Sequence, residues 1–275
     1  MTLALIVIAA LTASIALLWA IGAREPVYAI SEGDGPHWFV ALRGEAGALA
    51  PGVTQRWAGA ADFALIGADD AYWHRFAILS GGDADELPLA LDRAEDAFVA
   101  RVKLRRPPKP ILGLLKLLIA LGVLSRPSGD IIQDAQALEF RSDVMPGADA
   151  IAALLAKPTD YSPAMVNFLA YRDQAQYSKP RREISGAAAY LRYGMVALRT
   201  VYRTGGHLLF TGRIVSILRE AKAGPCAGRW DDVAAMRYPS PPAILSMEHA
   251  PDYRAALHHR DAGLERTVVI ASTPT

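Results

Sequence analysis

The order of strand-like and helix-like segments in residues 164–275 constrains the fold more than any other feature. Four runs read as strands: residues 165–172, 207–217, 230–238 and 267–271. Two helical stretches separate them, one from Ser185 to Thr204 and one that Pro239-Ser240-Pro241 opens and that runs to Gly263. Strand, helix, strand, strand, helix, strand is the order of a ferredoxin-like α+β domain.

The same residues carry a set of short motifs. They are Asn167 in VNFLAYR, YLRYG at 190–194, Gly205-Gly206, Trp230-Asp231, RYPS at 237–240, Met247, Tyr253 and HRDAGLER at 259–266. As a set, these motifs resemble the family of unknown function numbered thirteen-thirty, in the dimeric α+β-barrel superfamily. The resemblance covers roughly residues 145–273.

This resemblance implies two four-stranded sheets packed face to face around a cavity. Relatives in that superfamily include cofactor-free oxygenases, isomerases, haem-degrading enzymes and proteins without known activity. The family has no established catalytic residue, so the resemblance carries none over to this chain.

Residues 36–107 read as a degenerate copy of the same unit. Their strand-like runs are residues 38–43, 61–67, 72–79 and 97–104. We therefore expect two ferredoxin-like halves that form one α+β barrel within the chain, which would leave few open sheet edges. A barrel shared by two chains of a homodimer is the alternative.

The helices of this N-terminal copy are less clear than its strands. Asp83, with Glu86 three residues later in capping-box position, predicts a short helix that runs to about Asp92. The other helix would lie in residues 45–59, where Pro51-Gly52 interrupts it.

The first 23 residues contain no charged side chain, and Arg24-Glu25-Pro26 ends the apolar run. At about 1.5 Å per residue, this run spans a hydrocarbon core of about 30 Å. We expect residues 1–24 to be a permanent transmembrane anchor with Trp19 at the interface. A cleaved signal peptide is the alternative, but the run has no basic start, is long, and has no A-x-A site before Arg24.

Residues 111–124 form a second apolar stretch, too short to span a membrane comfortably and interrupted by Lys116. Seven basic residues and no acidic one occur from Phe98 to Arg126. We expect residues 108–128 to form a helix in the headgroup region of an anionic membrane, on the cytoplasmic side, or else a buried connecting helix. Residues 129–163 would be a linker with a short helix at 148–156.

Composition and motifs argue against several classes of function. The net charge is +1 and the basic runs at 101–109 and 179–182 contain no aromatic residues, so we expect no nucleic acid partner. The six His form no HxH or HxxxH pair, and His258 and His259 are expected on different sides of a helix, so we expect no metal. No GxGxxG, P-loop or G-x-S-x-G motif occurs, and we expect no cofactor. The single cysteine, Cys226, is expected to be unreactive.

Polar side chains on the predicted strands and helices are the candidates for a ligand pocket. Asn167 interrupts an apolar strand, where its amide needs partners. The other candidates are Tyr190, Tyr193, His207, Arg213, Arg237, Tyr238 and His258. A His or Arg beside an Asn or Tyr can polarise a carbonyl or hold an enolate. The structural alternatives are ion pairs of the two arginines with Asp231, Asp232 or Glu265, tyrosines in the core, and Ser240 as a helix cap.

Two classes of function fit these expectations. The first is a single-pass protein of a bacterial inner membrane whose barrel binds a small apolar or aromatic molecule, with cofactor-independent turnover as an option. The second is a non-catalytic module that docks a protein partner at the membrane surface. A cavity of several hundred cubic ångströms lined by Asn167, His207 and Arg237 would favour the first class. A sheet face closed by large side chains would favour the second.

Overall fold

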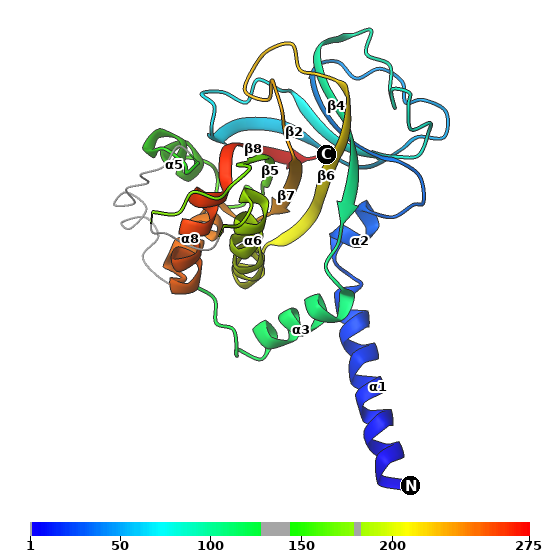
Figure 1. Cartoon of the computed structure of the whole chain (residues 1–275), viewed down its shortest axis with the longest axis vertical. Coiled ribbons are helices and arrows are strands. Elements are labelled where there is room, and N and C mark those ends of the chain that lie inside the picture. The colour runs from blue at the N-terminus through cyan, green and yellow to red at the C-terminus, as the bar shows by residue number, and fades with distance from the viewer. Residues whose placement is uncertain (1, 128–143, 179–182) are drawn as a thin grey trace.

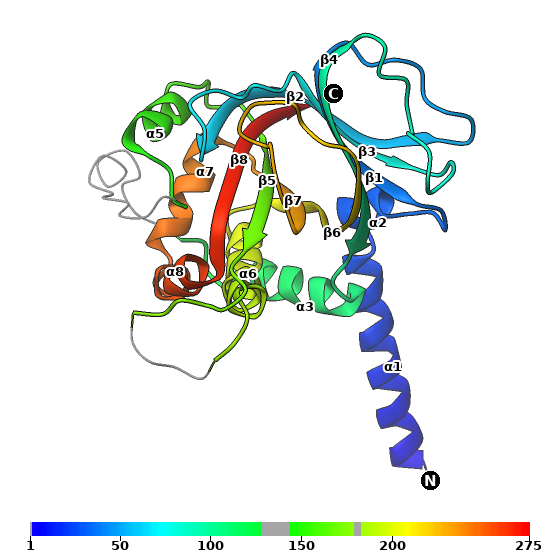
Figure 2. The same cartoon turned by 45° about the horizontal axis from the view of Figure 1, so that its top comes forward.

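A computed structural model describes residues 2–127, 144–178 and 183–275. The described chain is a mixed α/β protein built on a closed antiparallel barrel with the strand order β1-β3-β2-β8-β5-β7-β6-β4 (Figures 1 and 2). Helices lie on one side of this barrel, and the N-terminal helix projects away from it.

Each half of the chain contributes four neighbouring strands. The N-terminal half supplies β1 (His37–Gly44), β2 (Thr54–Ile66), β3 (Arg75–Ser80) and β4 (Ala94–Arg105), and the C-terminal half supplies β5 (Ala164–Tyr171), β6 (His207–Arg219), β7 (Asp232–Arg237) and β8 (Leu264–Pro274). Within each half the strands lie in the order fourth, first, third, second, and the pairs β2–β8 and β4–β6 join the halves. The barrel therefore closes within one chain, as in the first of the two expected arrangements.

Packed aromatic rings fill the barrel interior. Alternate residues of the strands point inward, among them Phe39, Phe76, Phe98, Phe168 and Phe210. The ring of Phe168 lies 5.2 Å from Phe39 and 5.5 Å from Trp230, measured between ring centroids. We expected a cavity between the two sheets. That expectation is wrong for the described residues, because large rings interdigitate across this space.

Helices cover the outer face of the C-terminal sheet. They are α5 (Ala148–Leu155), α6 (Gly186–Arg203), α7 (Pro241–Leu245), a 3₁₀ turn (Ser246–His249) and α8 (Pro251–Gly263). Ser185 caps α6 by accepting a hydrogen bond from the Ala188 N–H. The second predicted helix is divided into three segments, and Pro251 begins the last of them because proline suits the first helical turn. Ser240 occupies the cap position of α7, but its side chain makes no capping hydrogen bond.

Loops, not helices, cover the outer face of the N-terminal sheet. The expected helix from Asp83 to Asp92 is wrong: the carboxylate of Asp83 accepts the Asp85 N–H at 3.0 Å, which forms a turn. No helix forms in residues 45–53 either, and an isolated bridge between Leu49 and Leu89 links the two loops. Beneath them a cluster packs without a helix; it includes Trp38, Val40, Leu42, Leu79, Leu89 and Val99.

Three helices form the N-terminal attachment: α1 (Thr2–Gly22), α2 (Pro26–Ile30) and α3 (Lys109–Ala120). Helix α1 is long and apolar enough to cross a membrane, and its apolar window is 0% buried. Helix α3 crosses the barrel-proximal end of α1 and runs beneath α6 (Figures 1 and 2). The crossing is close because both helices present glycine: a Cβ at Gly113 would lie 1.8 Å from the Leu18 carbonyl oxygen.

The predicted linker is described only in part. Residues 128–143 lie outside the described residues, as does the basic run at 179–182. Helix α5 occupies the predicted position of the short helix within the linker.

Candidate functional site

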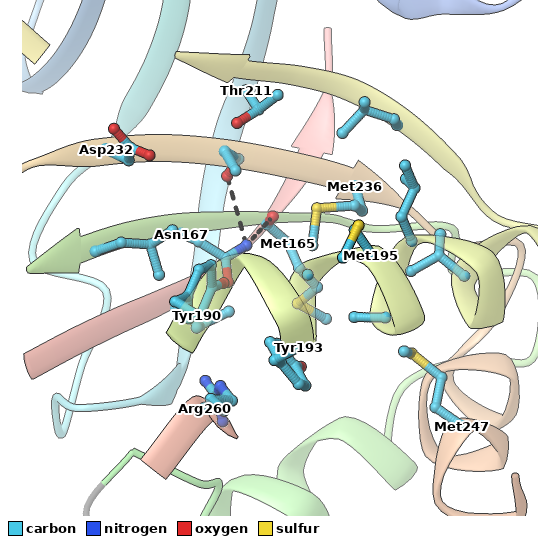
Figure 3. Close-up of a pocket in the computed structure, with 18 of the residues that line it drawn as sticks. Met165, Asn167, Tyr190, Tyr193, Met195, Thr211, Asp232, Met236, Met247 and Arg260 are labelled. Atoms are coloured by element: carbon cyan, nitrogen blue, oxygen red, sulfur yellow. Dashed lines mark hydrogen bonds between the residues drawn. The ribbon is translucent and has the colours of Figure 1, made fainter. Parts of the chain in front are cut away.

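A cavity of about 520 Å³ lies between α6 and the outer face of the C-terminal sheet (Figure 3). On β5, Met165, Asn167, Leu169 and Tyr171 line it, whereas the residues between them point into the barrel. This division follows from the alternation of side chains along a strand. The cavity thus uses the face of the sheet opposite to the one we expected.

Small residues on α6 leave this space open. Ala187, Ala188, Gly194 and Ala197 line the cavity, and a Cβ at Gly194 would meet no other atom within 4 Å. The two covering helices touch closely at their other end, where a Cβ on Gly186 would lie 2.4 Å from the Gly263 carbonyl oxygen. The helices are therefore held against each other at one end, while the small residues of α6 leave the cavity unfilled.

Methionine and tyrosine each contribute several side chains to the lining. Of the six methionines in the chain, five line the cavity: Met145, Met165, Met195, Met236 and Met247. Five tyrosines line it as well: Tyr171, Tyr190, Tyr193, Tyr238 and Tyr253. Methionine is flexible and polarisable, and tyrosine adds a polar end to an apolar ring, so this wall suits a mainly apolar molecule with few polar groups.

Asn167 lies at the centre of the cavity wall. Its side chain is 8% exposed, and the amide nitrogen donates to the carbonyl oxygens of Met165 at 2.8 Å and Ala234 at 3.4 Å (Figure 3). Both amide protons are thereby used. No described residue donates to the amide oxygen, which is free to accept a hydrogen bond from a ligand.

The tyrosines form a chain of rings along α6 and α8. The ring of Tyr190 lies between those of Tyr171 and Tyr193 and is tilted against both, and the hydroxyl of Tyr193 lies 3.1 Å from that of Tyr253. Tyr238 donates to the sulfur of Met247 at 3.5 Å. Burial raises the pKa of Tyr190, Tyr238 and Tyr253 above the usual range, so these hydroxyls stay neutral.

Charged residues line the cavity at two separate places. Near the end of β4, Arg105 forms an ion pair of 3.2 Å with buried Asp232, and Arg213 lies opposite Asp232 across the strands. Burial raises the pKa of Asp232, although Arg105 and the Tyr171 hydroxyl oppose this rise. Arg260 and Glu248 lie elsewhere in the lining, and Figure 3 shows Arg260 on the opposite side of Asn167 from Asp232.

Five of the eight predicted site residues line the cavity: Asn167, Tyr190, Tyr193, Arg213 and Tyr238. The other three do not. Arg237 donates to the Ser162 hydroxyl at 3.1 Å, and His258 contacts the Ala255 carbonyl at 2.7 Å on the exposed side of α8. His207 lies at the start of β6 and points toward the N-terminal attachment.

His207 belongs to a polar cluster around Glu25, which is 2% exposed. The carboxylate of Glu25 contacts His207 Nδ1 at 2.9 Å, Tyr202 Oη at 2.8 Å and Lys116 Nζ at 2.5 Å. Burial opposes ionisation, but these hydrogen bonds outweigh it and lower the pKa of Glu25 to about 2. The cluster joins the residues that follow the apolar helix to α3, α6 and β6.

The sequence analysis missed Arg260, Glu248, Asp232 and the five methionines. One signal was available: Tyr253, Ala256 and Arg260 recur at helical spacing on the buried face of α8, which places a cation in the core. The methionines are scattered over residues 145–247, and only the fold brings them together.

The structure describes the surroundings of Cys226 and of most of the other groups that could be reactive. Cys226 is buried, and burial raises the pKa of its thiol to about 12, which fits an unreactive side chain. Within the described residues, no group of three or more His, Cys, Asp or Glu could hold a metal ion. His258 and His259 do not point apart as expected, because their ring centroids lie 3.9 Å from each other.

Comparisons with known proteins name no activity. No family model matches the chain, and no curated protein matches it. Among solved structures, the chain is similar to RPA0582 from Rhodopseudomonas palustris, a protein of unknown function, with 31% identity over 47% of this chain and 95% of that one and a TM-score of 0.41. The methylated form of RPA0582 gives 29% identity over 50% of this chain and 97% of that one, with a TM-score of 0.42.

Proposed function

We propose that this protein is a membrane-anchored barrel protein that binds a small apolar or aromatic molecule between α6 and the C-terminal sheet. The observation that carries the proposal is the cavity itself. Its volume of about 520 Å³ lies in the range of small-molecule sites, and its wall is mainly apolar with a few polar groups. Cofactor-independent turnover of the bound molecule stays a prediction.

The position of the cavity supports a lipophilic ligand. Leu198 and Leu208 line the cavity and also belong to the cluster that α3 forms with α6 and β6. On the other side of α3, Ile111 and Leu114 are exposed, as is Leu121 just beyond its end. We infer that this apolar face of α3 lies in the membrane interface beside α1, and that the cavity is close to the layer in which lipophilic molecules concentrate.

The strand order supports the finer fold assignment. The arrangement of fourth, first, third and second strand is that of a ferredoxin-like sheet, and it occurs in both halves. We infer that the chain contains two such units, the first of which has lost its helices. Membership of family thirteen-thirty, and a homodimer of the whole chain, stay predictions.

Docking of a protein partner is the second class of function. The filled barrel interior matches what we expected of that class, but the cavity lies on the other face of the sheet and is open. The observed space therefore favours ligand binding.

A neutral probe tests ligand binding. Octanamide is titrated calorimetrically into the full chain in phosphatidylcholine nanodiscs, with empty nanodiscs as the reference for partitioning. Gly194→Phe places a ring in the open space beside α6 and should abolish saturable binding. Leu87→Phe in the N-terminal half is the matched control and should bind as the unsubstituted chain does. Equal binding by both variants would place the probe elsewhere, and no saturable binding by the unsubstituted chain would refute the proposal.

An alkaline wash tests the anchor. Membranes washed with carbonate should retain the full chain and release a shortened chain that begins at Arg24 and so keeps Glu25. Full-length chain in the soluble fraction would refute a transmembrane α1.

Labelling tests the position of α3. Because Cys226 is buried, an environment-sensitive dye on Leu121→Cys reports a single site. The dye should emit at shorter wavelength in nanodiscs than the same dye on Leu87→Cys. Equal emission from the two positions would remove α3 from the interface.

A further inference from the structure

Arg260 is a buried cation that forms no ion pair with a described carboxylate, although the charges of Glu248 and Asp261 act on it at longer range. Its side chain is 5% exposed, and its one hydrogen bond found in the described part of the chain goes to the sulfur of Met145, a weak acceptor, at 2.8 Å. No described carboxylate lies within ion-pair distance of it. Desolvating a charge without a close partner is costly, and an anionic ligand that pairs with Arg260 would offset this cost.

The guanidinium lines the cavity. Its central carbon lies 5.7 Å from the centroid of the Tyr193 ring, and in Figure 3 it lies beside Tyr190 and Tyr193. Five N–H groups in a planar fork are available for bidentate contact with a carboxylate, and the sulfur of Met145 occupies only one of them.

A neighbouring hydroxyl supplies a further donor. In the pair of Tyr193 and Tyr253, one hydroxyl donates to the other, so one proton remains to be donated elsewhere. Both residues line the cavity, and no other partner of these hydroxyls occurs in the described residues. A carboxylate beside Arg260 would accept a hydrogen bond from this hydroxyl.

One Arg neutralises one negative charge. Glu248 also lines the cavity and brings no positive charge, so the site does not suit a dianion such as a phosphate monoester. Apart from Asn167, Thr211 and the separate charged group of Arg105, Arg213 and Asp232, the rest of the wall is apolar or tyrosine, which favours an apolar body behind the charged group.

We propose that Arg260, with the hydroxyl pair of Tyr193 and Tyr253, forms an anion subsite that receives the carboxylate of an apolar carboxylic acid whose body fills the methionine-lined cavity. This inference rests on the proposed function and specifies the class of its ligand. A cavity without this subsite would bind neutral and charged molecules according to their hydrophobicity alone. A cavity with the subsite would prefer the carboxylate.

Matched probes test the subsite. Octanoate and octanamide have the same chain and differ in charge, and both are titrated into the full chain in phosphatidylcholine nanodiscs. A hydrogen bond to a charged group is worth about 1.5–3 kcal/mol, so octanoate should bind roughly tenfold to one hundredfold more tightly than octanamide. Arg260→Met should remove this preference by lowering octanoate affinity to that of octanamide.

Two further variants separate the subsite from general effects. Arg254→Met removes a cation from the exposed side of the same helix and should keep the preference for octanoate. Tyr253→Phe should lower octanoate affinity severalfold and octanamide affinity by a smaller factor, which keeps the test valid even where Arg260→Met does not fold.

The outcomes distinguish the two proposals. If the unsubstituted chain binds octanoate and octanamide equally, or Arg254→Met loses the preference as fully as Arg260→Met, the subsite is refuted and the cavity proposal stands. If neither probe binds, the proposed function fails and the subsite fails with it.

Discussion

The two halves of the barrel share a strand order and differ in what covers their outer faces. In the N-terminal half, Trp38 on β1 pairs with Leu79 on β3, and Val40 pairs with Ala77 on the same two strands. The corresponding pairs of the C-terminal half are Met165 with Met236 and Asn167 with Ala234. Loops close directly on the first set, while α6 and α8 cover the second.

The strand order is the same in both halves, so the sheet alone does not create the cavity. A large indole at Trp38 fills the layer beneath the short loops, so the N-terminal face is solid. The same layer beneath α6 contains the flexible side chain of Met165, the amide of Asn167 and the small residues of α6, and it contains the open cavity. The half that loops cover thus has no such space, and the half that helices cover has one.

The largest expected effect separates the solid face from the open one. Trp38→Ala should lower the free energy of unfolding by about 3–5 kcal/mol, because it leaves a cavity in a filled layer. Met165→Ala should cost only about 1–2 kcal/mol, because one side of that residue already faces open space. Thermal unfolding of the full chain in detergent measures both, and equal losses would contradict the difference between the faces.

Val40 and Asn167 occupy corresponding positions of the two halves. Exchanging their side-chain types should change the free energy of unfolding by unequal amounts. Val40→Asn buries an amide in an apolar cluster and should cost about 2–3 kcal/mol of stability. Asn167→Val removes two hydrogen bonds to backbone carbonyls beside an open cavity and should change stability by less than about 1 kcal/mol. Similar costs in the same unfolding assay would show that both layers are equally closed.

Acid should loosen the attachment, which contacts the C-terminal half through Tyr202 and His207. The folded pKa of Glu25 is about 2 against an ordinary value of 4.5, so its contribution is complete above pH 4.5 and is lost as the pH falls from 4.5 toward 2. Glu25→Gln should remove on the order of 2–3 kcal/mol at pH 7 and flatten the acid branch of the stability profile. If this variant loses stability with falling pH as the unsubstituted chain does, groups other than Glu25 cause the acid sensitivity.

Glu248 should act with the opposite sign. Burial raises its pKa from 4.5 to about 7, so the folded state binds the proton more tightly and stability falls as the pH rises through that window. Glu248→Gln should stabilise the chain by about 1–2 kcal/mol at pH 8 and have little effect at pH 4. Unfolding of both chains at the two pH values measures this gain in stability. An equal gain at pH 4 and pH 8 would point to a cause other than ionisation.

The smallest effect concerns the helix above the cavity. Gly194→Ala adds a methyl group in open space and removes the flexibility of glycine from a helix interior. It should raise stability by about 0.5–1 kcal/mol and keep octanamide binding. Loss of stability would show that the space beside Gly194 is closed in solution.

Local patterns predicted the strands and most of the helices of the C-terminal half. Alternation along β5 and the cap at Ser185 act over a few residues and are visible in sequence. The helix from Asp83 failed because a capping pattern also suits a turn, and tertiary packing of the loops decided between the two.

The position of the cavity could not be predicted in the same way. Both faces of β5 are buried, so its sequence does not show which face meets rings and which meets space. His207 was assigned to the pocket because it is a polar residue on a strand, but its partner, Glu25, lies 182 residues away in the chain. Arg260 was missed because a single arginine on a helix reads as solvent-exposed until the helix is docked.

The position of a bound ligand would show whether the cavity between α6 and the C-terminal sheet is the binding site. Crystals of the full chain are soaked with octanamide that carries bromine on its terminal carbon, and the anomalous signal locates the bromine. We expect the anomalous peak of the bromine between α6 and the outer face of β5 and β7, among the methionine side chains. A peak inside the barrel beside Phe168, or bromine found only on the molecular surface, would contradict it.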